Sequence, residues 1–106
     1  MKDFTSNHWT DAATGASSGG STYGPGFAVS WQNGPLGRDE NRIQPNGAFV
    51  ETVIKVAIDR LEYYQKSKFA STYNAEALAH LNEAVKRLNA RTEDRENRKV
   101  EGTHVQ

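Results

Sequence analysis

Asn46-Gly-Ala-Phe-Val-Glu-Thr-Val-Ile-Lys-Val-Ala-Ile-Asp-Arg-Leu-Glu-Tyr-Tyr-Gln65 decides the fold of this chain. Within it, apolar and aromatic residues recur at alternating spacings of four and three, at Val50, Ile54, Ala57, Leu61 and Tyr64. This spacing is typical of a heptad stripe along one face of a helix. We therefore expect a helix over residues 47–67, with Asn46 as its N-cap.

A second stripe follows after a short turn over residues 68–72, at Leu78, Leu81, Val85 and Leu88. It predicts a second helix over residues 73–97, capped by Ser71 or Thr72. The positions that extend this stripe at its two ends are polar, at Asn74, Thr92 and Arg95. Two stripes joined in this way predict a long antiparallel helix hairpin over residues 47–99, and the polar ends indicate a function for them.

The N-terminal half carries weaker signals. Residues 27–32 alternate bulky and small side chains after a Gly-Pro-Gly turn, as in a half-buried strand, and residues 33–46 form a polar loop. Residues 1–26 are rich in Ser, Thr and Gly, and we expect a flexible arm or an edge strand there, with the arm favoured and residues 12–22 as a connector.

The fold class that follows is α+β: a small N-terminal antiparallel β element, then the helix hairpin and a tail over residues 100–106. A chain of 106 residues is expected to be a single domain. A bare two-helix hairpin leaves part of each apolar stripe uncovered. We therefore expect a homo-oligomer, most simply a dimer that packs two hairpins into a bundle-like core.

Composition excludes several classes of protein. The chain has no cysteine, and its three histidines do not have metal-ligand spacing, so no metal or cofactor is expected. No apolar run reaches the roughly 18 residues of a membrane span, and the first residues do not read as a signal peptide. Thirteen basic and thirteen acidic residues give a net charge of zero, which argues against a general nucleic-acid binder. The sequence also lacks the phosphate-loop, zinc-helix and nucleophile-elbow motifs of common enzymes, and we expect no catalysis.

Four arginines lie along one side of the last turns of the second helix, at Arg87, Arg91, Arg95 and Arg98. Guanidinium groups spaced in this way can hold phosphates bidentately. The alternative is that they serve the helix dipole and form ion pairs with the neighbouring acidic residues. Residues 86–99 carry six basic and three acidic groups, and this local excess favours phosphate.

Tyr63 and Tyr64 end the first helix, and Asn74 begins the second. An aromatic ring can stack on a base and a carboxamide can read its edge. The alternative, favoured by the residues alone, is that one tyrosine fills the hairpin end while Asn74 satisfies a turn carbonyl. Asn74 and Arg91 are about 25 Å apart along a helix at ~1.5 Å per residue, so one small ligand cannot touch both within one chain.

The hairpin resembles a known family in Tyr63-Tyr-Gln-x-x-x-Phe69, Asn74-Ala and, above all, Arg91-Thr-x-x-Arg95-x-x-Arg98-Lys-Val-Glu-Gly-Thr-His104. This is the helix-hairpin family shared by phage anti-CBASS and Thoeris anti-defence sponge proteins. Residues 27–50 look more like the first type of Thoeris anti-defence proteins, which add an N-terminal β region. The resemblance covers about three quarters of the chain and leaves residues 1–26 outside it.

The resemblance implies a function. Members of this family bind cyclic signalling nucleotides of bacterial immune enzymes and hold them without cleavage. By position, Tyr64 and Asn74 are expected to contact a cyclic ADP-ribose isomer, the tyrosine by stacking. Phosphates are expected to be held by Arg91, Arg95 and Arg98, which in hexameric members surround a cyclic trinucleotide at a separate site. Of the loop arginines Arg38 and Arg42, we prefer Arg38 as a further contact.

The leading hypothesis is thus a phage anti-defence sponge that sequesters cyclic nucleotide signals, with glycocyclic ADP-ribose as the first candidate and cyclic di- or trinucleotides as further candidates. It would act in the cytoplasm of the infected bacterial host, as a dimer or as a hexamer built from three dimers. Two other hypotheses use the same arginines: a nucleic-acid-binding helical hairpin, and a structural virion protein whose arginines form interchain salt bridges.

Overall fold

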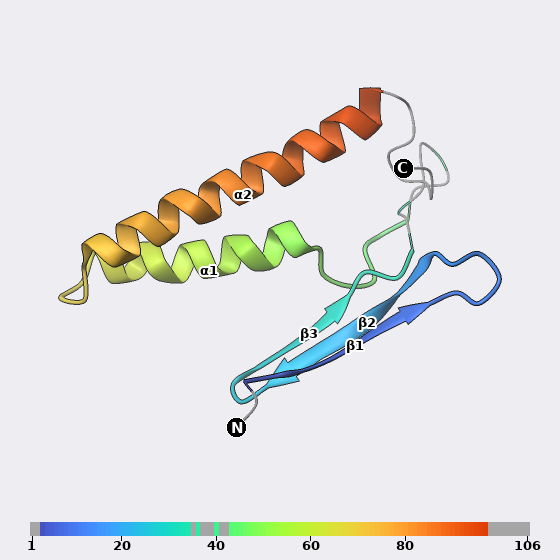
Figure 1. Cartoon of the computed structure of the whole chain (residues 1–106), viewed down its shortest axis with the longest axis horizontal. Helices are drawn as coiled ribbons and strands as arrows, with labels where there is room; N and C mark the ends of the chain where they lie inside the picture. Colours follow the sequence, from blue (N-terminus) through green and yellow to red (C-terminus); the bar gives the residue numbers. More distant parts are fainter. Residues whose placement is uncertain (1–2, 35, 37–39, 41–42, 98–106) are drawn as a thin grey trace. The chain divides into compact units, whose positions relative to one another are not determined.

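The computed structural model describes residues 3–34, 36, 40 and 43–97, with side chains as far as Asp94. The described chain is α+β, as predicted. Three strands are followed by two helices: β1 (Thr5–Thr10), β2 (Ser17–Gly24), β3 (Phe27–Trp31), α1 (Val50–Gln65) and α2 (Thr72–Asn97) (Figure 1). It divides into two compact units, of which one holds the strands and the other spans Val50–Arg95. The single-domain organisation stays a prediction.

The strands form one antiparallel sheet in the order β1-β2-β3. Its centre is polar, because Ser6 pairs with Thr22 and their hydroxyls lie 2.9 Å apart. The indole Nε1 of Trp31 on β3 donates to the same Thr22 Oγ1 at 2.8 Å. One row of side-chain hydrogen bonds therefore links all three strands.

This sheet corrects the prediction of a connector over residues 12–22, which is wrong from Ser17 onward because β2 begins there. We favoured a flexible arm over an edge strand for the N-terminal segment, but β1 is an edge strand. Ser and Gly are poor strand formers on propensity alone. Only glycine fits at position 20 of β2, because the Asn7 carbonyl occupies the space that a Cβ would need.

The segment before α1 is bound to the end of β3. The helix therefore begins later in the sequence than predicted. Ala48 forms an isolated parallel bridge with Trp31, and an added Cβ on Gly47 would lie 2.5 Å from the Trp31 carbonyl carbon. The Oδ1 of Asn46 accepts a hydrogen bond from the backbone N–H of Asn33 at 2.7 Å. Asn46 is therefore not the N-cap that we predicted, and α1 starts at Val50 rather than at residue 47.

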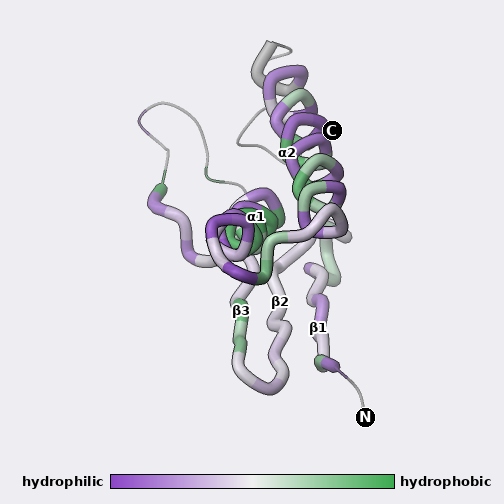
Figure 2. The backbone as a smooth tube through the Cα atoms, turned by 90° about the vertical axis from the view of Figure 1, so that its left-hand side faces the viewer, coloured by the Kyte–Doolittle hydropathy of each residue, from purple (hydrophilic) through white to green (hydrophobic). Residues whose placement is uncertain are grey.

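The hairpin itself is as predicted, with α1 and α2 running antiparallel from the intervening turn (Figure 1). The predicted stripe of α2 is half-buried along its length at Leu78, Leu81, Val85 and Leu88, interspersed with hydrophilic positions (Figure 2). In α1 the stripe is offset from the prediction, because Ala57 is exposed and Ile58 is buried in its place. No described helix is long and apolar enough to cross a membrane.

Ile58 is the only buried apolar side chain in the described part of the chain, at 9% exposed. We expect Ile58→Ala to lower the free energy of unfolding by about 2 kcal/mol, the lower end for such a truncation, because its neighbours are themselves half-exposed. Val56→Ala is the matched control, since Val56 on the same helix is 66% exposed. Chemical denaturation followed by circular dichroism measures both, and equal effects of the two variants would contradict this assignment of the core.

Candidate functional site

The turn between the helices is fixed by hydrogen bonds from short polar side chains. Ser71 Oγ accepts from the backbone N–H of Asn74 at 3.0 Å, so Ser71 is the N-cap of α2, one of the two predicted candidates. The Gln65 carboxamide bonds both backbone groups of Ser71, accepting at 2.9 Å and donating at 3.1 Å. Ser67 Oγ donates to the Tyr64 carbonyl at 2.7 Å. The end of α1 and the start of α2 are thus held in one geometry.

Three aromatic rings gather at this turn. The Tyr64 ring centroid lies 5.9 Å from that of Tyr63 and 6.2 Å from that of Phe69, the latter in an edge-on arrangement at 73°. Both distances are typical of favourable aromatic pairs. Tyr63 is 57% exposed and Phe69 63%, so neither ring is buried in the end of the hairpin. The cluster offers aromatic surface to solvent.

Arg60 is a member of this cluster that the sequence analysis missed. Its Cζ lies 4.9 Å from the Tyr63 ring centroid and 5.0 Å from that of Tyr64, within the range of cation–π contacts. Its Nε also donates a long hydrogen bond of 3.4 Å to the Tyr64 hydroxyl. This bond raises the pKa of Arg60 above its usual value. The missed signal was the spacing, because residues three and four positions apart share a helix face.

Asn74 lies in the first turn of α2 and is engaged with the turn. Its Nδ2 donates to the Phe69 carbonyl at 3.0 Å, which is the turn-carbonyl role given above as the alternative. No described group donates to its Oδ1, so this oxygen can still accept a hydrogen bond. The packing role and a ligand contact are therefore compatible, and the contact of Asn74 with a ligand stays a prediction.

The arginines of α2 lie toward the other end of the hairpin and are paired where their side chains are described. Arg87 Nε lies 3.1 Å from Glu83 Oε1 on the same helix. Arg91 pairs across the hairpin, with its Nη2 3.9 Å from Glu51 Oε1 in the first turn of α1, although its side chain is 61% exposed. Glu51 therefore faces Arg91 rather than Lys55, its neighbour four residues along α1.

Four candidate site residues fall wholly or partly outside this description. Arg95 belongs to α2, but its side chain is not among those described. Arg98 lies outside the described residues, as do the two loop candidates, Arg38 and Arg42. Their roles stay predictions.

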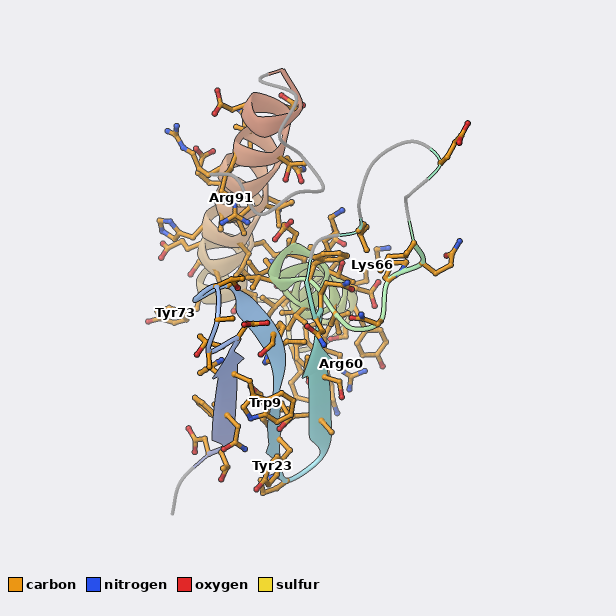
Figure 3. All side chains as sticks on the ribbon, turned by 90° about the vertical axis from the view of Figure 1, so that its right-hand side faces the viewer. Trp9, Tyr23, Arg60, Lys66, Tyr73 and Arg91 are labelled. Atoms are coloured by element: carbon orange, nitrogen blue, oxygen red, sulfur yellow. The ribbon has the colours of Figure 1, made fainter. Side chains whose placement is uncertain are left out.

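The described candidates thus form two groups at opposite ends of the hairpin. The turn cluster comprises Arg60, Tyr63, Tyr64, Phe69 and Asn74. The arginine end is represented by Arg91, seventeen residues beyond Asn74 on the same helix, or about 25 Å away. Figure 3 shows Arg60 and Arg91 on different helices, and Tyr73 pointing away from the hairpin. One small molecule cannot reach both groups within one chain.

The groups at the turn include the types that proteins use to contact nucleotides. They combine ring faces for a base, a carboxamide oxygen for a base edge, and a guanidinium for an anion. The described residues contain no group of His, Cys, Asp or Glu side chains arranged to hold a metal ion.

Comparison with known proteins gives two matches. The family described as the Acb2/Tad1 hairpin domain matches residues 27–93, which include the turn cluster and Arg91 but end before Arg95. A protein of Bacillus phage SBSphiJ7 named "Thoeris anti-defense 1" is 43% identical over 76 residues, or 72% of this chain and 51% of the relative. The chain therefore spans about half the length of this curated relative.

Proposed function

The chain belongs to the Acb2/Tad1 hairpin family, and from this premise we propose that it is a phage anti-defence protein that binds and sequesters cyclic nucleotide immune signals. Its ligands are glycocyclic ADP-ribose at the turn cluster and a cyclic di- or trinucleotide at the arginine end. It acts in the cytoplasm of the infected bacterial host, and it holds its ligands without cleaving them. The relative named as a Thoeris anti-defence protein supports the biological setting.

The observation that carries this proposal is the turn cluster. Its rings remain more than half exposed at Tyr63 and Phe69 although they are fixed in contact with Tyr64, which is a costly arrangement unless a partner covers them. Sequestration needs affinity for the ground state of the ligand and no stabilisation of a transition state. Stacking groups with a cation and an amide meet that need, and we therefore propose a binder rather than an enzyme.

Each candidate residue has a role in this proposal. Tyr64 stacks on the base, and Asn74 accepts from its edge through Oδ1. Arg38, from the loop before α1, adds a contact to the same ligand. At the other end, the phosphates of a cyclic trinucleotide are held by Arg91, Arg95 and Arg98.

We further propose that the protein is a homo-oligomer, a dimer or a hexamer built from three dimers. Among the described residues the hairpin buries one apolar side chain, Ile58, while Val50, Val56 and others on its surface are at least half exposed. Packing hairpins against one another would cover these surfaces. It would also bury a small ligand between subunits, which tight retention requires. Such a protein acts by mass action, so it must be abundant and bind more tightly than the effector does.

Titration calorimetry distinguishes the proposed function from nucleic-acid binding. Binding of glycocyclic ADP-ribose at micromolar or lower concentration is expected, with little response to a single- or double-stranded oligonucleotide. Oligonucleotide binding that falls steeply between 50 and 200 mM salt would instead identify a nucleic-acid-binding hairpin. If none of these ligands binds, the result would favour a structural role for the arginines. Light scattering on the same samples gives the oligomeric state.

The pairing of Arg91 with Glu51 makes a separate prediction for the arginine end. Glu51 competes with a phosphate for the Arg91 guanidinium, so Glu51→Gln should tighten binding of a cyclic trinucleotide by about two- to fivefold, the range expected for a solvent-exposed ion pair. Glu62→Gln, which removes an unpaired carboxylate from the same helix, is the control. Weaker trinucleotide binding by Glu51→Gln would mean that Glu51 orients Arg91 for the ligand.

A further inference from the structure

Arg60 differs from the other described arginines of the hairpin in forming no ion pair, although the charge of the neighbouring Asp59 helps to stabilise its guanidinium. Arg87 is paired with Glu83 and Arg91 with Glu51, whereas no ion pair involves Arg60 in the part of the chain that the structure describes. Its guanidinium instead lies over the rings of Tyr63 and Tyr64. A charge that lies on an aromatic surface and is not engaged in an ion pair is available to an anion.

The hydrogen bonds of Arg60 also indicate that its guanidinium is available to an anion. Only its Nε is engaged, in the long bond to the Tyr64 hydroxyl, and no described acceptor bonds its two terminal nitrogens. A guanidinium can stack on a ring and still present its remaining N–H groups in a planar fork that matches two phosphate oxygens. Arg60 therefore has the geometry to bind a phosphate while it stays in contact with Tyr64.

Within one chain, distance favours a cation of the turn over the arginines at the far end of α2. A nucleotide whose base stacks on Tyr64 carries its phosphates within several ångströms of that ring. Arg91 lies about 25 Å along α2 from Asn74 and cannot reach them within the same chain. Another described cation at the turn, Lys68, has its Nζ 5.5 Å from the Phe69 ring centroid. Arg60 is the cation that contacts Tyr64 itself.

We infer that Arg60 is a ligand-binding residue that holds the diphosphate of the nucleotide whose base stacks on Tyr64, so that base and phosphate are bound at one hairpin turn. This inference rests on the proposed function and assigns to the turn a phosphate contact of its own. The base uses the part of the Tyr64 ring that Arg60 leaves open, and the two Arg60 terminal nitrogens donate to phosphate oxygens. The arginine end of the hairpin then serves a different ligand.

Arg60→Gln tests the inference, because it removes the charge and keeps a polar side chain at an exposed position. We expect it to weaken binding of glycocyclic ADP-ribose by about 10- to 100-fold, the loss typical of hydrogen bonds to a charged group. Lys55→Gln is the matched control, since it removes one exposed positive charge from the same helix, and it should change the affinity by less than about twofold. Arg60→Lys, which keeps the charge but loses the fork, should fall between wild type and Arg60→Gln.

Salt dependence separates a phosphate contact from support of the Tyr64 ring. If Arg60 binds phosphate, the affinity of Arg60→Gln should depend less on salt concentration than that of the wild-type protein. An equal loss at every salt concentration would mean that Arg60 only positions Tyr64, and unchanged affinity would mean that it does neither. Either result would overturn the inference while leaving the proposed function intact. Failure of the wild-type protein to bind would instead overturn both.

Discussion

Tyr64→Ala is expected to lower the affinity for glycocyclic ADP-ribose by about 10- to 100-fold, as measured by calorimetry. The Tyr64 ring lies at the centre of the turn cluster, in contact with Tyr63, Phe69 and Arg60. Stacking of a base on an aromatic side chain contributes roughly 1–3 kcal/mol. Truncation also removes the ring that supports Arg60, so the loss should lie toward the upper part of this range.

The matched control is Tyr73→Ala. Tyr73 lies near the same turn but is 82% exposed and makes none of the ring contacts of the cluster, so its removal should leave the affinity within about twofold. Tyr64→Phe keeps the ring and loses only the long hydrogen bond to Arg60, and it should retain most of the binding. Equal losses from Tyr64→Ala and Tyr73→Ala would contradict a specific site at the turn.

The second large effect concerns the arginine end. Arg91→Ala combined with Arg95→Ala should weaken binding of a cyclic trinucleotide by at least about 100-fold, because two charged hydrogen-bonding groups are removed. Binding of glycocyclic ADP-ribose should change by less than about threefold, since the turn lies about 25 Å away along α2. Calorimetry with both ligands on one protein preparation measures the difference.

A double control accounts for the change in net charge. Lys55→Ala with Lys66→Ala removes one positive charge from α1 and one from the residue that follows it, and should affect neither ligand by more than about twofold at physiological salt. The Arg91 variant leaves Glu51 unpaired, so its melting temperature should be compared with that of the wild-type protein. Equal loss of both ligands from the arginine variant would mean one shared pocket, built where the turn of one hairpin meets the arginine end of another.

The hairpin was predictable because its signal is periodic. The stripe of α2 is half-buried at all four predicted apolar positions, since a spacing of three and four fixes one helix face without knowledge of the partner. The start of α1 was not predictable in the same way. Gly47 is a poor helix former and Ala48 a good one, so propensity does not fix the start of the helix. Their contact with Trp31 is a tertiary interaction that prevents the helix from starting earlier.

The sheet, in contrast to the hairpin, was not predictable from a local sequence pattern. β2 is built from Ser, Gly, Thr and one Tyr, a composition that reads as a connector. Its stability depends on cross-strand contacts that no local pattern reveals, such as the hydrogen bond between the Ser6 and Thr22 hydroxyls and the one that Trp31 donates to Thr22. Strand propensity reflects such surroundings more than the residues themselves.

The candidate site was predictable as two clusters but not in its details. Tyr64 and Asn74 do lie together at the turn, because the end of one helix and the start of the next must be adjacent in a hairpin. The hydrogen bond from Asn74 to the Phe69 carbonyl was anticipated only as the alternative to a ligand contact. Arg60 was overlooked because its spacing of three and four residues from the two tyrosines was not considered.

The most direct measurement of the central claim is recovery of the ligand after binding. The purified protein is incubated with glycocyclic ADP-ribose, separated from unbound ligand by gel filtration, and heated to unfold it, and the released molecule is analysed by chromatography and mass spectrometry. We predict that a stoichiometric amount of intact glycocyclic ADP-ribose is released. Release of a cleaved product, or of no nucleotide at all, would contradict sequestration.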